Sequence, residues 1–160
     1  MTDGVKDAGL ASLCGLGTAL DGMKGTAPGS AAGEAFDAFS AAYSQVSADG
    51  AGTFIFAPQA YDAVMLMAIS AAANGVTGPD IASGLVAASS GGEKCIGVAC
   101  IELAANGVDV DYVGASGEIE LNEAGDPTAA TYDIWTTEGD TNPVLRLSLI
   151  HISEPTRPNN

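Results

Sequence analysis

The segment Gly52–Gly75, GTFIFAPQAYDAVMLMAISAAANG, decides the fold that the sequence predicts. Its first part, Thr53–Ala57, is a short β-branched and aromatic run that predicts a buried strand, and Pro58 ends that run. The second part, Ala60–Ala73, is apolar on nearly every side, which predicts a helix covered by neighbours. A buried strand that leads into a buried helix indicates a layered α/β domain.

The turn between this strand and this helix is a candidate ligand site. Ligands of open α/β sheets bind beyond the carboxyl ends of the strands, where Phe56, Gln59 and Tyr61 would stand. An aromatic wall and an amide suit an aliphatic or amide-bearing molecule. Tyr61 has a second interpretation, which we favour, as a core residue whose hydroxyl bonds to a backbone group.

The stretch 56–69, FAPQAYDAVMLMAI, resembles a segment of periplasmic binding proteins for branched-chain amino acids and amides. Further segments stand in the order that this family would place them: Thr2–Val5, Leu20–Met23, Gly25–Gly29, Tyr112–Gly117, Asn122–Asp126 and Tyr132–Trp135. The resemblance implies an α/β, periplasmic-binding-protein-like type I fold. Such a fold has two Rossmann-like lobes joined by a three-strand hinge, and this chain would carry only part of it, as an internal fragment.

The resemblance also implies a division of the chain between the lobes. Residues 1–27 would end the second lobe, residues 28–126 would form part of the first lobe, and residues 127–146 would return through the hinge to a second-lobe strand. The two hinge strands would be Gly25–Ala27 and Asp126–Ala130.

The last fourteen residues of the chain, 147–160, differ in origin from the rest in our interpretation. Leu147–Pro158, LSLIHISEPTRP, resembles the translation of a sequencing-library adapter, so we expect residues 147–160 to be a non-native tail, with an ordinary exposed tail as the alternative. His151 is the only histidine of the chain, and setting it aside removes every imidazole from catalysis. We expect no catalytic residue and no cofactor.

Local signals predict the remaining elements. Ser30 is a natural N-cap for a helix that runs to Val46 and carries aromatic residues on one face, and Asp80 can cap a helix that follows Gly78-Pro79. The other predicted helices are Gly4–Leu13 and Ile101–Ala105, and the other predicted strands are Met23–Ala27, Val110–Val113, Glu118–Leu121 and Thr131–Trp135.

Asp3 is the strongest candidate for binding a charged ligand. The resemblance implies that an acidic residue before a glycine at this position holds the α-amino group of an amino acid. The alternative is that Asp3 caps the helix Gly4–Leu13, and one residue can do both.

Cys95 and Cys100 stand five residues apart, and the resemblance implies that they form a disulfide, whereas two reduced cysteines on a short helix are the alternative. A bond would fit an oxidising compartment.

We predict no metal site. A zinc site would need a second cysteine pair, which the chain lacks. The run Asp109–Gly114 resembles a calcium-binding loop, but Val113 stands where an oxygen ligand is needed.

The charge balance excludes two classes of partner. The chain has 20 acidic and 5 basic residues, with a net charge of −15, which disfavours nucleic acid and anionic membranes. The sequence contains no run of about eighteen apolar residues, so it does not predict a membrane span. At 47% hydrophobic residues the composition is globular.

The predicted function is the solute-binding component of an ABC importer for branched-chain amino acids, amides or related small solutes. Its partners would be that solute and the permease subunits, in the periplasm or outside the cell, with or without a lipid anchor. We expect no enzymatic activity, and no tight solute binding by these residues alone. The alternative is a ligand-sensing domain of a receptor or regulator with the same fold.

Overall fold

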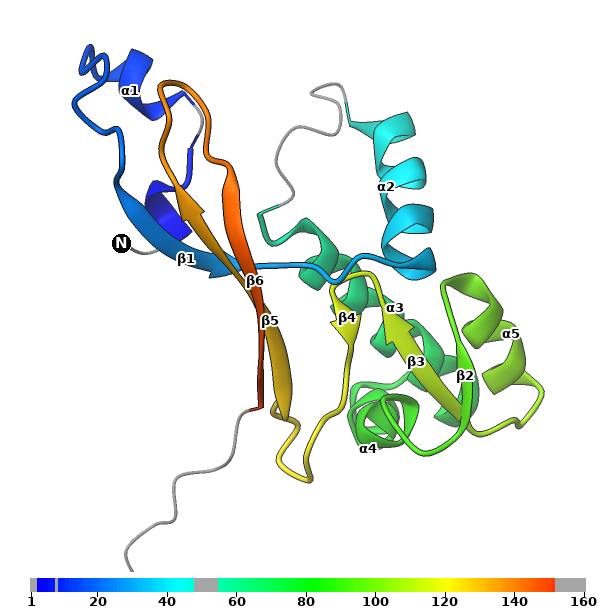
Figure 1. The fold of residues 1–160 in the computed structure, drawn as a ribbon. Helices are drawn as coiled ribbons and strands as arrows, with labels where there is room; N and C mark the ends of the chain where they lie inside the picture. The colour runs from blue at the N-terminus through cyan, green and yellow to red at the C-terminus, as the bar shows by residue number, and fades with distance from the viewer. Residues whose placement is uncertain (1–2, 8, 48–54, 152–160) are drawn as a thin grey trace, which may run out of the picture. The chain divides into compact units, whose positions relative to one another are not determined.

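The structure is a computed structural model that describes residues 3–7, 9–47 and 55–151. The chain divides into two compact units, and Figure 1 shows its elements. Unit 1 comprises residues 1–61, 115–117 and 131–149, and unit 2 comprises residues 62–114, 118–130 and 150–160.

Unit 1 contains a sheet of three strands in the order β1-β5-β6. They are β1 (Lys24–Pro28), β5 (Ala129–Thr136) and β6 (Val144–His151). β1 runs antiparallel to β5, with Gly25 opposite Trp135. Trp135 has an exposed fraction of 0%, and a glycine opposite it leaves room for the indole because facing residues share one side of the sheet.

The first residues of unit 1 form a 3₁₀ helix η1 (Asp3–Val5) and a short helix α1 (Leu10–Leu13). The predicted single helix over residues 4–13 is therefore wrong. Gly4 and Gly9 both disfavour a helix, and α1 begins directly after Gly9.

Helix α2 (Glu34–Val46) begins after Gly33 and not after Ser30, so the predicted N-cap is wrong. The predicted aromatic face is present, because the Phe39 ring lies 6.3 Å from Phe36 and 5.6 Å from Tyr43. Val46, the predicted last residue of the helix, ends α2 and is 84% exposed.

The predicted strand Thr53–Ala57 is wrong in its described part, because helix α3 (Ala57–Asn74) is longer than predicted and already includes Ala57. Ile55 and Phe56 form a bend, while Thr53 and Phe54 lie outside the described residues. The helix starts early because Pro58 suits a first helical turn, where a missing N–H costs nothing. The amide of Ala60 donates to the Phe56 carbonyl at 2.9 Å and closes that turn.

Helix α3 is also less covered than its apolar sequence predicts. Met65, Leu66 and Ile69 are buried, but Val64 is 59% exposed and Met67 is 44% exposed. One side of the helix packs in the core, and the other side is open in the described structure.

The second sheet has the order β2-β3-β4, with β2 (Glu93–Cys95), β3 (Val110–Gly114) and β4 (Gly117–Glu118). β2 is parallel to β3, and Cys95 lies opposite Tyr112. In Figure 1 the helices α4 (Gly78–Ala88) and α5 (Val98–Ala105) belong to the same green-to-yellow part of the ribbon. The predicted strand at 110–113 and the predicted helix at 101–105 are confirmed, each with extended bounds.

The start of α4 corrects the predicted cap. Thr77 is the N-cap, and Asp80 completes a capping box with it: the Thr77 side chain accepts from the Asp80 amide, and the Asp80 carboxylate accepts from the Thr77 amide. Gly78 and Pro79, which we expected to precede the helix, are its first two residues, because proline fits the first turn.

Three strand predictions differ from the structure. Of the predicted strand 118–121 only Glu118 lies in β4, and Leu121 instead forms an isolated bridge with Pro127. β5 extends the predicted Thr131–Trp135 at both ends. β6 was not predicted, and it includes residues 147–151 of the segment that we had set aside as a tail.

The structure has strands at parts of the two segments that the resemblance assigns to the hinge. Gly25–Ala27 lies within β1, whereas of Asp126–Ala130 only the last two residues belong to β5. The compact units change over between Tyr61 and Asp62. The assignment of segments to lobes stays a prediction.

Candidate functional site

Phe56 stands at the entrance to α3 in an unusual backbone conformation. Its φ is 64°, in the left-handed region that a bulky side chain rarely adopts, and it is the only non-glycine residue with positive φ in the described part of the chain. The side chain is 48% exposed. Strained residues of this kind cluster at binding sites, and an exposed aromatic ring offers apolar contact area to a small molecule.

Gln59 lies one turn further along and is held by one end of its amide. Its Nε2 donates to the Gly29 carbonyl at 2.8 Å. Its Oε1 is buried and accepts no hydrogen bond within the described structure. A buried acceptor without a partner costs roughly 1 to 3 kcal/mol, so this oxygen is a natural place for a ligand N–H or a water molecule.

Tyr61 packs against helix α2 in the same unit. Its ring centroid lies 5.2 Å from that of Phe39, with the rings tilted by 52°. This contact favours the interpretation of Tyr61 as a core residue that we preferred from the sequence. The side chain is still half-buried, so one part of it faces away from the core.

Asp3 is half-buried in η1, which packs against β1. Its backbone carbonyl accepts from the Lys6 amide at 2.9 Å, and its carboxylate forms no ion pair with any described residue. Lys6 instead pairs with Asp133 at 2.9 Å, with side chains only 10% and 16% exposed. The Asp3 carboxylate is therefore available to a cation.

The four candidates belong to unit 1, but they form two groups. Phe56, Gln59 and Tyr61 share the first turns of α3, whereas Asp3 lies in η1. No hydrogen bond or ion pair joins Asp3 to the other three among the residues that the structure describes.

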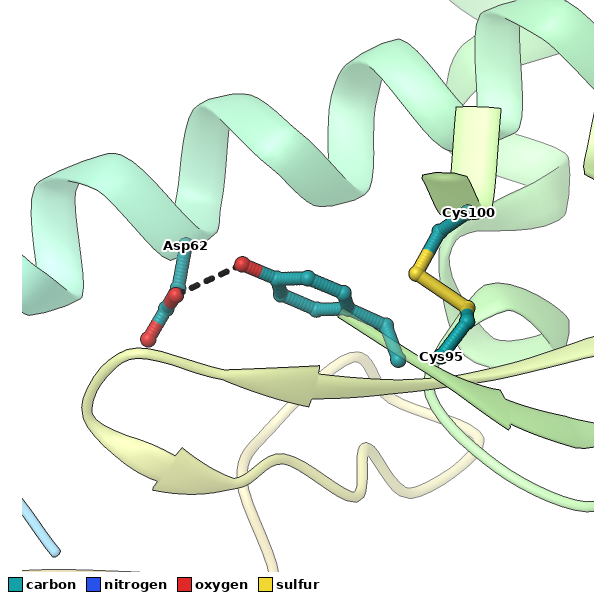
Figure 2. The surroundings of a disulfide bond; sticks show 4 residues. Asp62, Cys95 and Cys100 are labelled. Carbon is teal, nitrogen blue, oxygen red and sulfur yellow. Dashed lines mark hydrogen bonds between the residues drawn. A yellow bond between two sulfur atoms is a disulfide. The ribbon is translucent and has the colours of Figure 1, made fainter. Parts of the chain in front are cut away.

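Unit 2 contains a buried polar pair. Asp62 is 2% exposed and accepts a hydrogen bond from the Tyr112 hydroxyl at 2.8 Å. Figure 2 shows this bond beside the disulfide. The partner lies 50 residues away, and no local pattern marked it.

Cys95 and Cys100 are bonded in the structure, with their Cα atoms 5.4 Å apart. The bond joins the end of β2 to the first turns of α5, and both cysteines are buried. Cys14 is an exposed free thiol. Among the described residues no group of three or more His, Cys, Asp or Glu side chains is placed to hold a metal ion.

One ion pair in unit 2 is fully in solvent. Lys94 Nζ contacts Glu118 Oε1 at 2.5 Å, and this hydrogen bond and the Glu118 charge raise the pKa of Lys94 above its ordinary value. Exposed pairs of this kind contribute little to stability.

Comparison with known protein families identifies the domain. Residues 12–140 match the receptor family ligand binding region. The chain belongs to this family. Comparisons with curated proteins and with solved structures found no match. The receptor-family ligand-binding region is of the type I periplasmic-binding-protein kind, and the mixed α/β fold described above fits part of such a domain.

Membership of the receptor-family ligand-binding region makes this a small-ligand-binding domain. None of the helices in the described ranges combines the length and the hydropathy that a membrane crossing requires. The matched residues include Phe56, Gln59 and Tyr61, while Asp3 lies before the matched range.

Proposed function

We propose that this chain is part of the solute-binding component of an ABC importer for branched-chain amino acids, amides or related small solutes. Family membership supports a small-ligand binder. The choice of solute class rests on the chemistry of Gln59, Phe56 and Asp3.

The observation that carries the proposal is the state of the Gln59 amide. Because Nε2 is already bonded to the Gly29 carbonyl, the amide plane is anchored and Oε1 cannot simply rotate into solvent. Oε1 is buried and has no partner among the described residues. A fixed acceptor beside an exposed aromatic ring suits a solute that has an N–H group next to an aliphatic body.

In the proposed mechanism, Gln59 accepts a hydrogen bond from a solute N–H and Phe56 contacts the aliphatic part. Asp3 provides the negative charge for an ammonium group. Tyr61 supports this wall through its contact with Phe39. Binding would be completed by closure of two lobes about a hinge, and the closed form would dock on the permease and deliver the solute unchanged. The protein would act in the periplasm or outside the cell, with or without a lipid anchor.

The test uses the product of the complete reading frame that encodes these residues. We expect leucine, isoleucine, valine or a small amide to raise its melting temperature selectively, and calorimetric titration then yields the affinity. Gln59→Leu should weaken binding by about tenfold, which corresponds to the loss of a buried hydrogen bond.

Gln45→Leu is the matched control, because Gln45 is exposed on α2 and its Nε2 donates only to the Ala41 carbonyl of the same helix. This variant should bind normally. A folded full-length product that responds to none of these solutes, or equal binding by the Gln59 variant, would count against the proposal.

A second candidate is a ligand-sensing domain of a receptor or regulator, and the family description itself favours it. The two functions predict different neighbouring sequence. A signal sequence with a lipid-attachment cysteine would support the importer, whereas a following transmembrane helix or kinase domain would support the sensor.

A further inference from the structure

A cavity of about 300 Å³ lies within unit 2, and none of the four candidate residues lines it. Its floor consists of Ile69, Ala88, Ala104 and Val110, which are between 1% and 5% exposed. This volume is at the lower end of the range for small-molecule sites. The floor is apolar and built from short or branched side chains, so it suits a short aliphatic group.

The polar wall of the cavity is already hydrogen-bonded. The buried Ser70 hydroxyl donates to the Ile81 carbonyl at 2.7 Å, and Asn74 Nδ2 donates to the Ser70 carbonyl at 3.1 Å. The first bond ties α3 to α4, and the second lies within α3; together they hold the wall in place. The wall is therefore fixed in shape. Other groups determine whether the cavity prefers a charged ligand.

Three helices contribute their last turns to the lining. Ala73 and Asn74 end α3, Ala87 and Ala88 end α4, and Ala104 lies next to the last residue of α5. The end of a helix leaves carbonyl groups without partners inside the helix and carries about half a negative charge. The ends of α3 and α4 create a negative potential at the cavity, whereas at the end of α5 the carbonyls of Leu103 and Ala104 already accept from the amides of Val108 and Gly107.

The only charged residue of the lining strengthens this potential. Asp109 is exposed at the rim, and its carboxylate forms no ion pair with any residue in the described ranges. No lining residue is basic. Lys94, on the strand next to β3, is engaged with Glu118.

We propose that this cavity binds a small organic cation, a primary ammonium on a short branched aliphatic chain. The aliphatic chain would contact Ile69, Ala88 and Val110. The ammonium would lie at the rim, between the Asp109 carboxylate and the carbonyl ends of α3 and α4. A zwitterionic amino acid is disfavoured, because its carboxylate would meet the same negative potential with no basic residue to pair with.

The test is a titration of the oxidised 160-residue chain with isopentylammonium, isopentanol and isovalerate, which share a branched carbon skeleton and differ in charge. Methyl NMR signals of Ala88 and Ala104 report binding at the floor. We expect saturable shifts with isopentylammonium, binding of isopentanol that is about fivefold weaker, and no shift with isovalerate or leucine.

Two variants and a control separate the contributions. Asp109→Asn should weaken isopentylammonium binding by about threefold to fivefold and leave isopentanol unchanged. Ala87→Leu, at an exposed lining position, should block both ligands by filling the cavity mouth. Glu102→Gln removes the same charge from an exposed position of α5 outside the lining, and it should change neither.

Absence of a saturable shift with isopentylammonium would overturn the inference, and so would isovalerate or isopentanol binding as strongly as the amine. An unchanged amine affinity in Asp109→Asn would also overturn it. Gln59→Leu, which tests the proposed solute site, should leave amine binding at the cavity intact. The two proposals can therefore be contradicted independently of each other.

Discussion

Tyr112 donates a hydrogen bond to Asp62 across 2.8 Å, and both side chains are buried, at 1% and 2% exposed. The bond connects β3 to the first half of α3 within unit 2. Gly114 makes this approach possible, because a Cβ there would lie 2.6 Å from Asp62 Oδ2. A buried carboxylate needs hydrogen-bond donors, and the Tyr112 hydroxyl is one of them.

Tyr112→Phe should lower the free energy of unfolding by about 2 kcal/mol, because a hydrogen bond to a charged buried group is lost while the ring is kept. Denaturant titration followed by circular dichroism measures this change. Tyr132→Phe is the control, since Tyr132 is half-buried in β5 and its hydroxyl forms no bond with a described residue. Equal effects of the two variants would contradict the role given to the Asp62 bond.

Two glycines of α4 should respond oppositely to alanine. Gly84→Ala would place a Cβ 2.3 Å from Ser70 Oγ, which is fully buried and bonded to Ile81, and we expect a loss of about 1 to 3 kcal/mol from the strain. Gly78→Ala meets no atom within 4 Å and should leave stability unchanged or raise it by up to about 1 kcal/mol. Thermal melting of both variants tests the packing of α4 on α3, and an unaffected Gly84 variant would show that this packing is loose.

Removing the disulfide should destabilise unit 2. Cys95→Ala with Cys100→Ala should cost about 2 kcal/mol, because the short loop gains freedom in the unfolded chain. A reducing agent should lower the melting temperature of the original chain and leave that of the double variant unchanged. Cys14→Ser is the control for thiol chemistry and should melt normally, since Cys14 is exposed.

The ion pair between Lys6 and Asp133 should show coupling in a double-mutant cycle. Either Lys6→Met or Asp133→Leu leaves a largely buried charge without this partner, and we expect a loss of about 2 kcal/mol or more from each. The double variant should lose less than the sum of the two single losses. Additive losses would mean that the pair contributes nothing beyond its separate side chains.

Local sequence patterns predicted the middle of most elements and missed several ends. The apolar run 60–73 was correctly predicted as helical, and a strand was correctly predicted at 110–113. The start of α3 was missed because Phe56 has strand propensity, while Pro58 fits a helix start equally well. β6 was missed because residues 147–151 were set aside for their resemblance to an adapter.

At the candidate site, too, the sequence indicated some residues but not the contacts that they make. Phe56, Gln59 and Tyr61 could be singled out because they are close in the chain and follow one turn. Their partners could not: Gly29 is 30 residues from Gln59, and the Phe39 ring reaches Tyr61 from another helix. The cavity in unit 2 had no sequence signal, since small residues such as Ala73 and Ala104 occur throughout this alanine-rich chain.

The sequence by itself determined the family resemblance, the strong negative charge and the positions of the main apolar segments, because these depend on composition and on neighbouring residues. Only the tertiary structure decided that Gln59 Oε1 is buried with no partner among the described residues, that Tyr112 meets Asp62, and that three helix ends line one cavity. Each of these depends on side chains from distant segments meeting at bonding distance, and the side-chain directions that allow it are set by packing, not by local propensity.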